Sequence, residues 1–248
     1  MSAVVLITGA SRGIGAATAL LAARAGYAVA VNYSANSLAA DEVVRQIRQA
    51  GGTAMAVQAD VADEAQVLTM FEKVDAKLGR LTALVNNAGV VDQTSRVDAM
   101  SMARFKRMFE INVFGSFVCA REAVRRMSTR HGGTGGTIVN LSSVAARLGA
   151  PGQYVDYAAA KGAIDSFTVG LAKEVAAEGI RVNAVRPGII DTDIHASGGL
   201  PDRAREMAPQ VPMQRPGSAE DVARSILWLM GPESSYTTGT VLDVTGGR

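Results

Sequence analysis

Tyr157 and Lys161 have residue types and a spacing that suit proton transfer. They stand four positions apart, so in a helix both side chains lie on one face. A free phenol has a pKa of about 10 and is a poor base near neutrality, but a neighbouring ammonium group lowers that pKa. Tyr154 lacks such a partner, because Ala158 stands four residues after it. The pair can be an ordinary helix surface, yet its place after a strand ending Leu-Ser-Ser favours Tyr157 as a general acid/base.

A glycine-rich turn follows the first expected strand, with the sequence Thr8-Gly9-Ala10-Ser11-Arg12-Gly13-Ile14-Gly15. Three glycines let the backbone turn sharply, approach a pyrophosphate and pack a helix on the strand. The following helix presents free N–H groups and a partial positive charge at its start. A glycine turn without a ligand is the alternative, but the order strand, turn and helix favours dinucleotide binding.

Short β-rich apolar runs alternate with longer amphipathic stretches, which predicts βα units on a parallel sheet. The predicted strands are Val4–Ile7, Ala28–Val31, Thr53–Gln58, Ala83–Asn86, Thr137–Leu141, Arg181–Arg186 and Thr240–Val244. The predicted helices cover residues 14–25, 36–50, 63–78, 101–129, 156–178 and 218–230. We therefore expect one α/β domain over residues 1–248, a doubly wound Rossmann fold whose seven-stranded parallel sheet carries helices on both faces. The irregular stretch 189–217 is the expected substrate-binding lid.

Composition excludes several other classes of protein. The formal net charge of +2 gives no electrostatic case for a nucleic-acid partner. No run of about 20 apolar residues is present to span a membrane, and the N-terminus lacks the basic leader of a signal peptide. One cysteine, Cys119, is compatible with the cytoplasm, which is the expected location. The two histidines, His131 and His195, form no metal-binding pattern, so no metal is expected.

Taken together, these motifs resemble the classical short-chain dehydrogenase/reductase family from residue 4 to about residue 245. The turn has the family pattern TGxxxGxG. The other landmarks follow in the family's order: Asp60-Val61, Asn86-Asn87-Ala88-Gly89, Asn112, Ser143, Tyr157-x-x-x-Lys161, Asn183 and Pro187-Gly188.

The resemblance implies four catalytic residues: Asn112, Ser143, Tyr157 and Lys161. Tyr157 would give a proton to a carbonyl oxygen while the nicotinamide delivers hydride to the carbon. Ser143, favoured over Ser142 by the family register, would hydrogen-bond that oxygen. Lys161 would also hold the nicotinamide ribose, and Asn112 would hold a water that passes protons to Lys161. Ser143 stands one position farther from Tyr157 than is usual, so we expect an extra residue in the loop Gly149–Asp156, reshaping the substrate wall.

The expected cofactor is NADP(H). No carboxylate ends the second strand, where NAD-selective sites place one, and Arg12, Asn32 and Ser34 offer donors for a 2′-phosphate instead. By resemblance, Asp60 would accept from the adenine amino group, with Val61 packed on the ring. Asn86 can line the cofactor or serve only the turn. The residues expected at the dinucleotide are Gly9, Ser11, Arg12, Gly13, Ile14, Gly15, Asn32, Tyr33, Ser34, Asp60, Val61, Asn87, Ala88, Gly89, Tyr157, Lys161, Pro187, Gly188, Ile190 and Thr192.

The expected substrate is a small ketone, aldehyde, secondary alcohol, sugar or polyol. The alternative substrate is a 3-ketoacyl-carrier protein, which the acidic end of the catalytic helix, Lys173–Glu178, disfavours. A non-catalytic NADP-sensing protein is the alternative from another class. The resemblance also implies a homotetramer or homodimer that pairs through helices 101–129 and 156–178.

Overall fold

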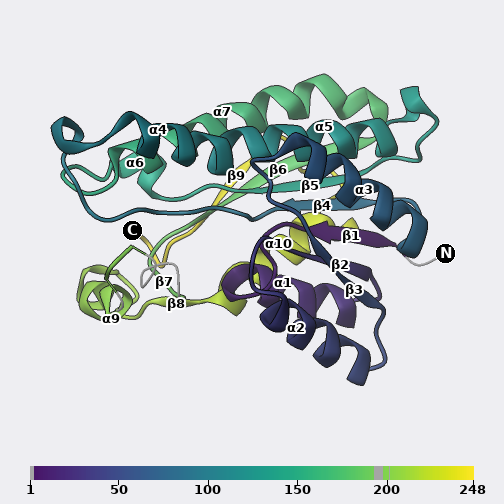
Figure 1. The fold of residues 1–248 in the computed structure, drawn as a ribbon, viewed down its shortest axis with the longest axis horizontal. Helices are drawn as coiled ribbons and strands as arrows, with labels where there is room; N and C mark the ends of the chain where they lie inside the picture. The colour runs from purple at the N-terminus through teal and green to yellow at the C-terminus, as the bar shows by residue number, and fades with distance from the viewer. Residues whose placement is uncertain (1–2, 193–197, 201) are drawn as a thin grey trace.

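The computed structural model describes residues 3–192, 198–200 and 202–248. Its centre is a seven-stranded parallel sheet in the order β3-β2-β1-β4-β5-β6-β9 (Figure 1). These strands are β1 (Val4–Ile7), β2 (Ala28–Tyr33), β3 (Ala54–Gln58), β4 (Ala83–Asn86), β5 (Gly136–Leu141), β6 (Ile180–Pro187) and β9 (Val241–Val244). The strand order reverses between β1 and β4, which is where doubly wound sheets open a crevice for ligands at the carboxyl ends of the strands.

Helices cover both faces of the sheet, as the two layers in Figure 1 show. One face packs against α1 (Gly13–Arg24), α2 (Ser37–Gln49) and α10 (Ala219–Met230). The other packs against α3 (Glu64–Leu78), α5 (Gly115–Met127) and α7 (Val155–Val175). Strands buried on both faces carry near-continuous apolar runs, so β1 and β2 read Val-Val-Leu-Ile and Ala-Val-Ala-Val. The predicted Rossmann fold is confirmed, with strand bounds within two residues of those expected.

The predicted helix 101–129 is interrupted. It consists of α4 (Met102–Phe109), a π-helical turn (Glu110–Phe114) and α5. Apolar periodicity does not reveal such a turn, because the flanking helices continue the same pattern. A π-turn inside an α-helix often marks a functional site, and this one contains Asn112.

The expected lid region contains short elements that the sequence pattern did not predict. They are β7 (Ile190–Asp191), α9 (Arg203–Met207), a 3₁₀ turn (Ala208–Gln210) and β8 (Gly217–Ser218), which pairs with β7. His195 and the rest of 193–197 lie outside the described residues. Another short helix, α6 (Ala145–Leu148), follows β5 and was also not predicted. α9, β7 and β8 lie near the carboxyl ends of the strands, on the left in Figure 1.

Candidate active site

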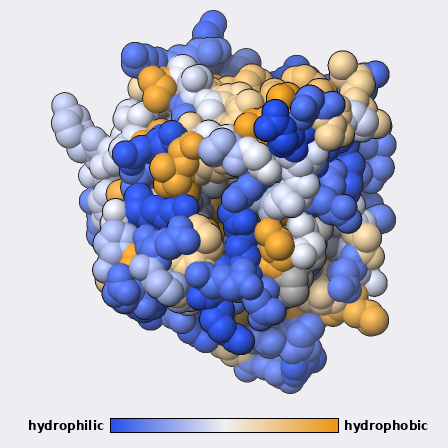
Figure 2. All heavy atoms as spheres, turned by 90° about the vertical axis from the view of Figure 1, so that its left-hand side faces the viewer, coloured by the Kyte–Doolittle hydropathy of each residue, from blue (hydrophilic) through white to orange (hydrophobic). Residues whose placement is uncertain are grey.

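Two neighbouring cavities open at the carboxyl edge of the sheet. The first, here the turn cavity, has a volume of about 650 Å³ and is lined by the glycine turn and the ends of β2, β3 and β4. The second, here the tyrosine cavity, has a volume of about 430 Å³ and is lined by Ser143, Tyr157 and Lys161. Ile14, Asn87, Gly89 and Thr192 line both cavities, so the two adjoin. Figure 2 shows this face, where hydrophobic side chains border a narrow hollow in a largely hydrophilic surface.

The predicted dinucleotide residues gather around these cavities. All of them line one cavity or both, except Gly15. Gly15 is buried, and a Cβ there would stand 2.6 Å from Asn87 Nδ2 and from the Gly9 carbonyl oxygen. It therefore serves close helix–strand packing. Gly9 and Gly13 have φ of +61° and +56°, a region that disfavours other residues.

Thr8 and Asn87 join the turn to β4. The Thr8 hydroxyl accepts from the backbone N–H groups of Asn87 and Ala88, at 3.0 Å each, and Asn87 Nδ2 donates to the carbonyls of Thr8 and Gly9. Asn86 instead points into the core, where its Nδ2 donates to Ser116 O and Asn140 Oδ1. Of the two uses left open for Asn86, the structural one is confirmed.

The prediction that Asn32 donates to a 2′-phosphate is wrong. Its side chain is 1% exposed, and Oδ1 accepts from Gly9 N at 3.1 Å. Nδ2 donates to two backbone carbonyls, that of Val57 in β3 at 3.3 Å and that of Ala59 just after β3 at 3.1 Å. Asn32 thus fixes the turn against two strands, and its donors are used by the protein itself. Arg12, Tyr33 and Ser34 do line the turn cavity, and so do Asp60 and Val61.

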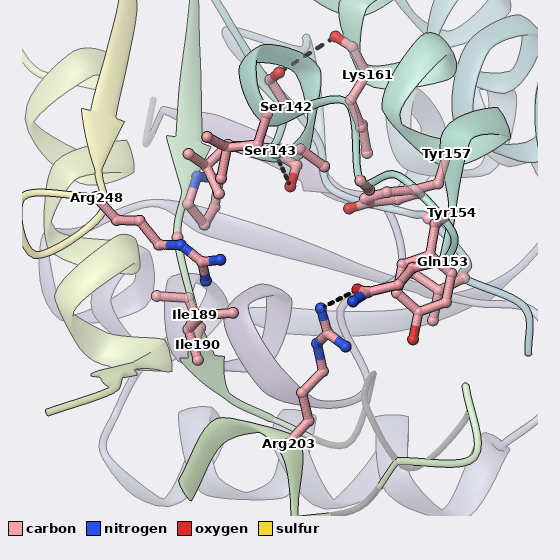
Figure 3. A pocket seen from close by; sticks show the side chains of 18 of the residues that line it. Ser142, Ser143, Gln153, Tyr154, Tyr157, Lys161, Ile189, Ile190, Arg203 and Arg248 are labelled. Atoms are coloured by element: carbon pink, nitrogen blue, oxygen red, sulfur yellow. Dashed lines mark hydrogen bonds between the residues drawn. The ribbon is translucent and has the colours of Figure 1, made fainter. Parts of the chain in front are cut away.

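Tyr157 and Lys161 lie on one face of α7, as predicted, and both face the tyrosine cavity (Figure 3). Lys161 is 4% exposed, and its Nζ donates to Leu141 O at 2.7 Å and lies 5.6 Å from the centre of the Tyr157 ring. The ammonium group is therefore anchored to the end of β5, over the ring of Tyr157.

The expected lowering of the Tyr157 pKa is not what the protein's own groups produce. Burial raises the pKa of Tyr157 to about 12, while a hydrogen bond from Ser143 works in the opposite direction. Burial also lowers the pKa of Lys161 to about 8, against a smaller opposing effect of Asp165. Desolvation disfavours the charged form of each group, so the buried pair resists becoming phenolate and ammonium.

The two serines after β5 are distinguished as expected. Ser143 interacts with the Tyr157 hydroxyl and also accepts from Ala145 N at 3.2 Å. Ser142 is 3% exposed and its hydroxyl donates to Lys161 O at 3.3 Å. Ser143 therefore stands beside the phenol, while Ser142 ties β5 to α7.

The side chain of Asn112 is fully engaged within the protein. Its Nδ2 donates to Val90 O and Met108 O, both at 3.0 Å, and its Oδ1 accepts from Val90 N at 3.2 Å. These bonds tie the side chain to α4 and to the segment after β4. What the side chain does is hold the segment after β4, where a Cβ on Gly89 would stand 2.7 Å from Asn112 Oδ1.

The loop Gly149–Asp156 forms a wall of the tyrosine cavity, as expected. Ala150, Pro151, Gln153 and Tyr154 line that cavity, and Ala150 has a φ of +45°. A non-glycine residue in this region carries local strain of the kind found at functional sites.

Three arginines at the cavities were not anticipated. Arg203 and Arg248 line the tyrosine cavity, and Arg107 lines the turn cavity. Arg203 stands in the expected lid, but nothing in its local sequence indicates where the side chain points. Arg248 reaches the cavity only because β9 ends beside β6.

The described part of the chain holds neither a metal-binding cluster nor a membrane-spanning helix. No cluster of three or more His, Cys, Asp or Glu side chains there could hold a metal ion. None of the helices in the described ranges is both long and apolar enough to cross a membrane.

Comparisons with known proteins agree with this architecture. A family model described as enoyl-(acyl carrier protein) reductase matches residues 9–248. The chain is 55% identical to the uncharacterized oxidoreductase YgfF of Escherichia coli K12, over 99% of this chain and 100% of that protein. It is 40% identical to a 3-oxoacyl-[acyl-carrier-protein] reductase of Synechocystis, over 98% of this chain and 96% of that protein.

Two further relatives bear on the reaction and the cofactor. The chain is 40% identical to cis-4-hydroxycyclohexanecarboxylate dehydrogenase of Sinomonas cyclohexanicum, over 98% of this chain and 95% of that protein. The solved structure of a short-chain dehydrogenase from Burkholderia cenocepacia in complex with NADP superposes with a TM-score of 0.89 and 34% identity, over 98% of this chain and 96% of that chain. This chain therefore belongs to the short-chain dehydrogenase/reductase family, whose enzymes act on CH–OH groups with NAD(P).

Proposed function

We propose that this protein is an NADP(H)-dependent oxidoreductase that interconverts a small carbonyl compound and its secondary alcohol, with Tyr157 as the proton-transfer group. The observation that carries the proposal is the placement of Tyr157 and Ser143 in a cavity that adjoins the glycine turn. An NADP-bound structural relative and a dehydrogenase of a hydroxycyclohexanecarboxylate support the cofactor and the substrate size.

The residues present fit a dinucleotide. The turn cavity is open above Gly13, where an added Cβ would meet only Thr192, at 3.6 Å. Asp60 is the one carboxylate among its described lining residues, against the guanidinium groups of Arg12 and Arg107. A site of this charge suits an additional phosphate on the adenosine ribose. We therefore assign NADP(H) rather than NAD(H).

The chain's own groups supply the proton and the orientation. The raised pKa keeps Tyr157 protonated at neutral pH, which is the form that donates a proton to a carbonyl oxygen. Ser143 would hydrogen-bond the same oxygen as negative charge develops on it. NADPH, when bound, supplies the hydride for the carbonyl carbon. In the reverse direction Tyr157 must first lose its proton, so oxidation requires help that reduction does not.

Replacement of Tyr157 by phenylalanine tests the proposal. We expect NADPH binding to persist and carbonyl reduction to fall by at least about 10²-fold, the usual contribution of a positioned acid. Unchanged turnover of neutral ketones by this variant would overturn the assignment. Binding of NADPH by the wild type without turnover of any carbonyl compound would favour the sensing protein.

The second candidate substrate is a 3-ketoacyl-carrier protein, which the Synechocystis relative favours. The argument against this substrate is the acidic segment Lys173–Glu178 at the end of α7, because carrier proteins are themselves acidic. Comparing a 3-ketoacyl-carrier protein with the free ketone as substrate decides between them. A preference for the carrier-bound substrate would favour the reductase of acyl chains.

Pairing with a second copy of the chain is also part of the proposal. α5 and α7 expose aromatic and aliphatic side chains on a common surface, where Phe117 stacks on Phe167 with ring centres 3.7 Å apart. Phe114 and Phe117 are 57% and 40% exposed. Apolar patches of this kind mark interaction surfaces. Light scattering on the purified protein should give the mass of a dimer or tetramer.

A further inference from the structure

Three cationic side chains line the tyrosine cavity. Its described lining residues include Lys161, Arg203 and Arg248, and no Asp or Glu is among them. Figure 3 shows the guanidinium group of Arg248 directed into the cavity from the left and that of Arg203 from below, with the labelled serines and Lys161 above them. Most of the remaining wall is apolar, with Val144, Leu148 and Met207 as examples. An apolar cavity with a few polar groups is typical of a small-molecule site.

Arg203 is held in place by neutral partners. Its Nη2 donates to Gln153 Oε1 at 2.6 Å, and its guanidinium carbon lies 5.4 Å from the centre of the Tyr154 ring. Gln153 and Tyr154 belong to the cavity wall, so these contacts fix the guanidinium group at the cavity without neutralising it. A guanidinium group has five N–H donors, and the Gln153 contact uses one of them.

Two other partly buried arginines, Arg104 and Arg186, are paired with carboxylates, whereas Arg181 donates to the Ser234 hydroxyl and to backbone carbonyls. Arg104 bonds to Asp156, and Arg186 bonds to Asp165 and Asp243. No ion pair to a carboxylate is found for Arg203 or Arg248 among the described residues. Because sheltering an uncompensated charge from water is costly, a cationic cavity favours a ligand that brings the opposite charge.

We propose that the natural substrate carries a carboxylate, which Arg203 binds with the help of Arg248, while its carbonyl or hydroxyl carbon lies at Tyr157. The substrate class is therefore a keto acid and its hydroxy acid, with an apolar body between the two functional groups. In the reduction, NADPH gives a hydride to the carbonyl carbon and Tyr157 gives a proton to the oxygen. The carboxylate takes no part in the reaction and is retained in the hydroxy acid. This inference rests on the proposed function of the site.

A matched pair of substrates tests it. The kcat/KM is measured for keto acids from 3-oxobutanoate to 6-oxoheptanoate and for their methyl esters, in the wild type and in Arg203→Gln, Arg203→Lys and Arg248→Gln. Loss of one charge-assisted contact should lower kcat/KM for the preferred acid by about 10- to 100-fold, mainly through KM. Values for the ester should change less than about twofold, because it lacks the charge. Arg203→Lys should restore part of the loss.

The control variant is Arg205→Gln. Arg205 lies on the same helix, but its side chain is 89% exposed, so this change should leave both substrates unaffected. If Arg203→Gln lowers acid and ester turnover equally, Arg203 only holds the lid and the proposal is wrong. A wild type that prefers the esters also overturns it.

Binding without turnover separates this inference from the proposed function. Hexanoate has a carboxylate and no carbonyl, and it should bind the NADP-loaded wild type, whereas hexanamide should not. Calorimetry should show that the binding disappears in Arg203→Gln while NADP affinity persists. Neutral ketones reduced in a Tyr157-dependent manner, with no hexanoate binding, would overturn the carboxylate and leave the oxidoreductase intact. Hexanoate binding without any ketone turnover would support the carboxylate site and overturn the proposed oxidoreductase.

Discussion

Arg104 of α4 holds Asp156, the residue directly before Tyr157, in a buried two-point ion pair. The Nε–Oδ2 and Nη2–Oδ1 distances are 2.7 and 3.2 Å, and the two side chains are 10% and 1% exposed. Arg104 Nη1 also donates to Gln93 O at 2.6 Å. The pair therefore ties the first turn of α7, which carries the phenol, to α4 and to the segment after β4.

Replacing Asp156 by asparagine should destabilise the protein and misplace Tyr157. Removing one partner leaves the other charge buried, so the free energy of unfolding should fall by about 3 kcal/mol. The kcat of reduction should fall as well, because the acid is held less firmly. Denaturant titration and steady-state rates measure the two effects. Asp98→Asn is the control: Asp98 pairs with Arg96 on the surface, and this change should cost less than about 0.5 kcal/mol.

The sequence predicted the frame of this site and one wall, the loop Gly149–Asp156, but not the contacts between distant residues that hold them together. The glycine turn and the pair of Tyr157 and Lys161 were predicted from short-range spacing. The glycines lie within one turn, and the pair is four residues apart. Strand bounds followed from apolar runs that end at turn residues. Arg104 and Asp156 stand 52 positions apart, and no local pattern indicates such a contact.

Two of the expected site residues make contacts within the protein that the sequence did not indicate. Asn32 and Asn112 have polar side chains at positions where a ligand contact was expected, and both are spent on backbone groups of other elements. A sequence shows that a hydrogen-bond donor is present, but not which carbonyl oxygen accepts from it. Helix spacing likewise places Lys161 near Tyr157 without giving the burial of the two groups, and burial raises the pKa of Tyr157 and lowers that of Lys161.

Lys161 should make stability depend on pH in the alkaline range. Its pKa falls from 10.5 to about 8 on folding, so the unfolded chain binds more protons between these values and stability rises with pH. From pH 7 to pH 9.5 the gain is about 1.5 units at 1.36 kcal/mol each, roughly 2 kcal/mol. The difference in unfolding free energy between wild type and Lys161→Met, measured by urea titration at both values, isolates this residue. A constant difference would contradict the lowered pKa.

Tyr157 should make the two reaction directions differ in their pH dependence. With its pKa raised to about 12, the phenol is the donor form throughout the neutral range, so the rate of reduction should be flat from pH 6 to pH 8. Alcohol oxidation needs the phenolate, whose fraction rises about tenfold per pH unit below the pKa. Initial rates in both directions, at saturating dinucleotide, show the contrast. A reduction rate that falls steeply across this range would argue for a much lower pKa.

Dinucleotide choice should respond to charge at the turn cavity. Tyr33 ends β2 and lines that cavity, about 20 residues after the glycine turn. In Tyr33→Asp the carboxylate would repel a 2′-phosphate and accept from a ribose hydroxyl, so preference should move toward NADH. Arg12→Gln should raise the KM for NADPH and leave that for NADH nearly unchanged. An equal effect of Arg12→Gln on both dinucleotides would show that Arg12 does not meet the 2′-phosphate.

Gly89→Ala should damage the site where the two cavities meet. An added Cβ would stand 2.7 Å from Asn112 Oδ1 and 3.5 Å from Lys161 Nζ. Asn112 is fixed by three hydrogen bonds to backbone groups, so the segment after β4 must shift instead. We expect a loss of about 1–3 kcal/mol in unfolding free energy, typical of overpacking, with weaker NADPH binding.

Gly162→Ala provides the comparison for this prediction. Gly162 lies in α7, directly after Lys161, and its added Cβ meets nothing within 4 Å. Since alanine is favoured over glycine inside a helix, this variant should gain about 0.5–1 kcal/mol. Both variants are measured by thermal unfolding and by titration with NADPH. If Gly89→Ala binds NADPH and unfolds like Gly162→Ala, the close approach of Gly89 to Asn112 does not constrain the site. The place where the two cavities adjoin would then accommodate an added methyl group.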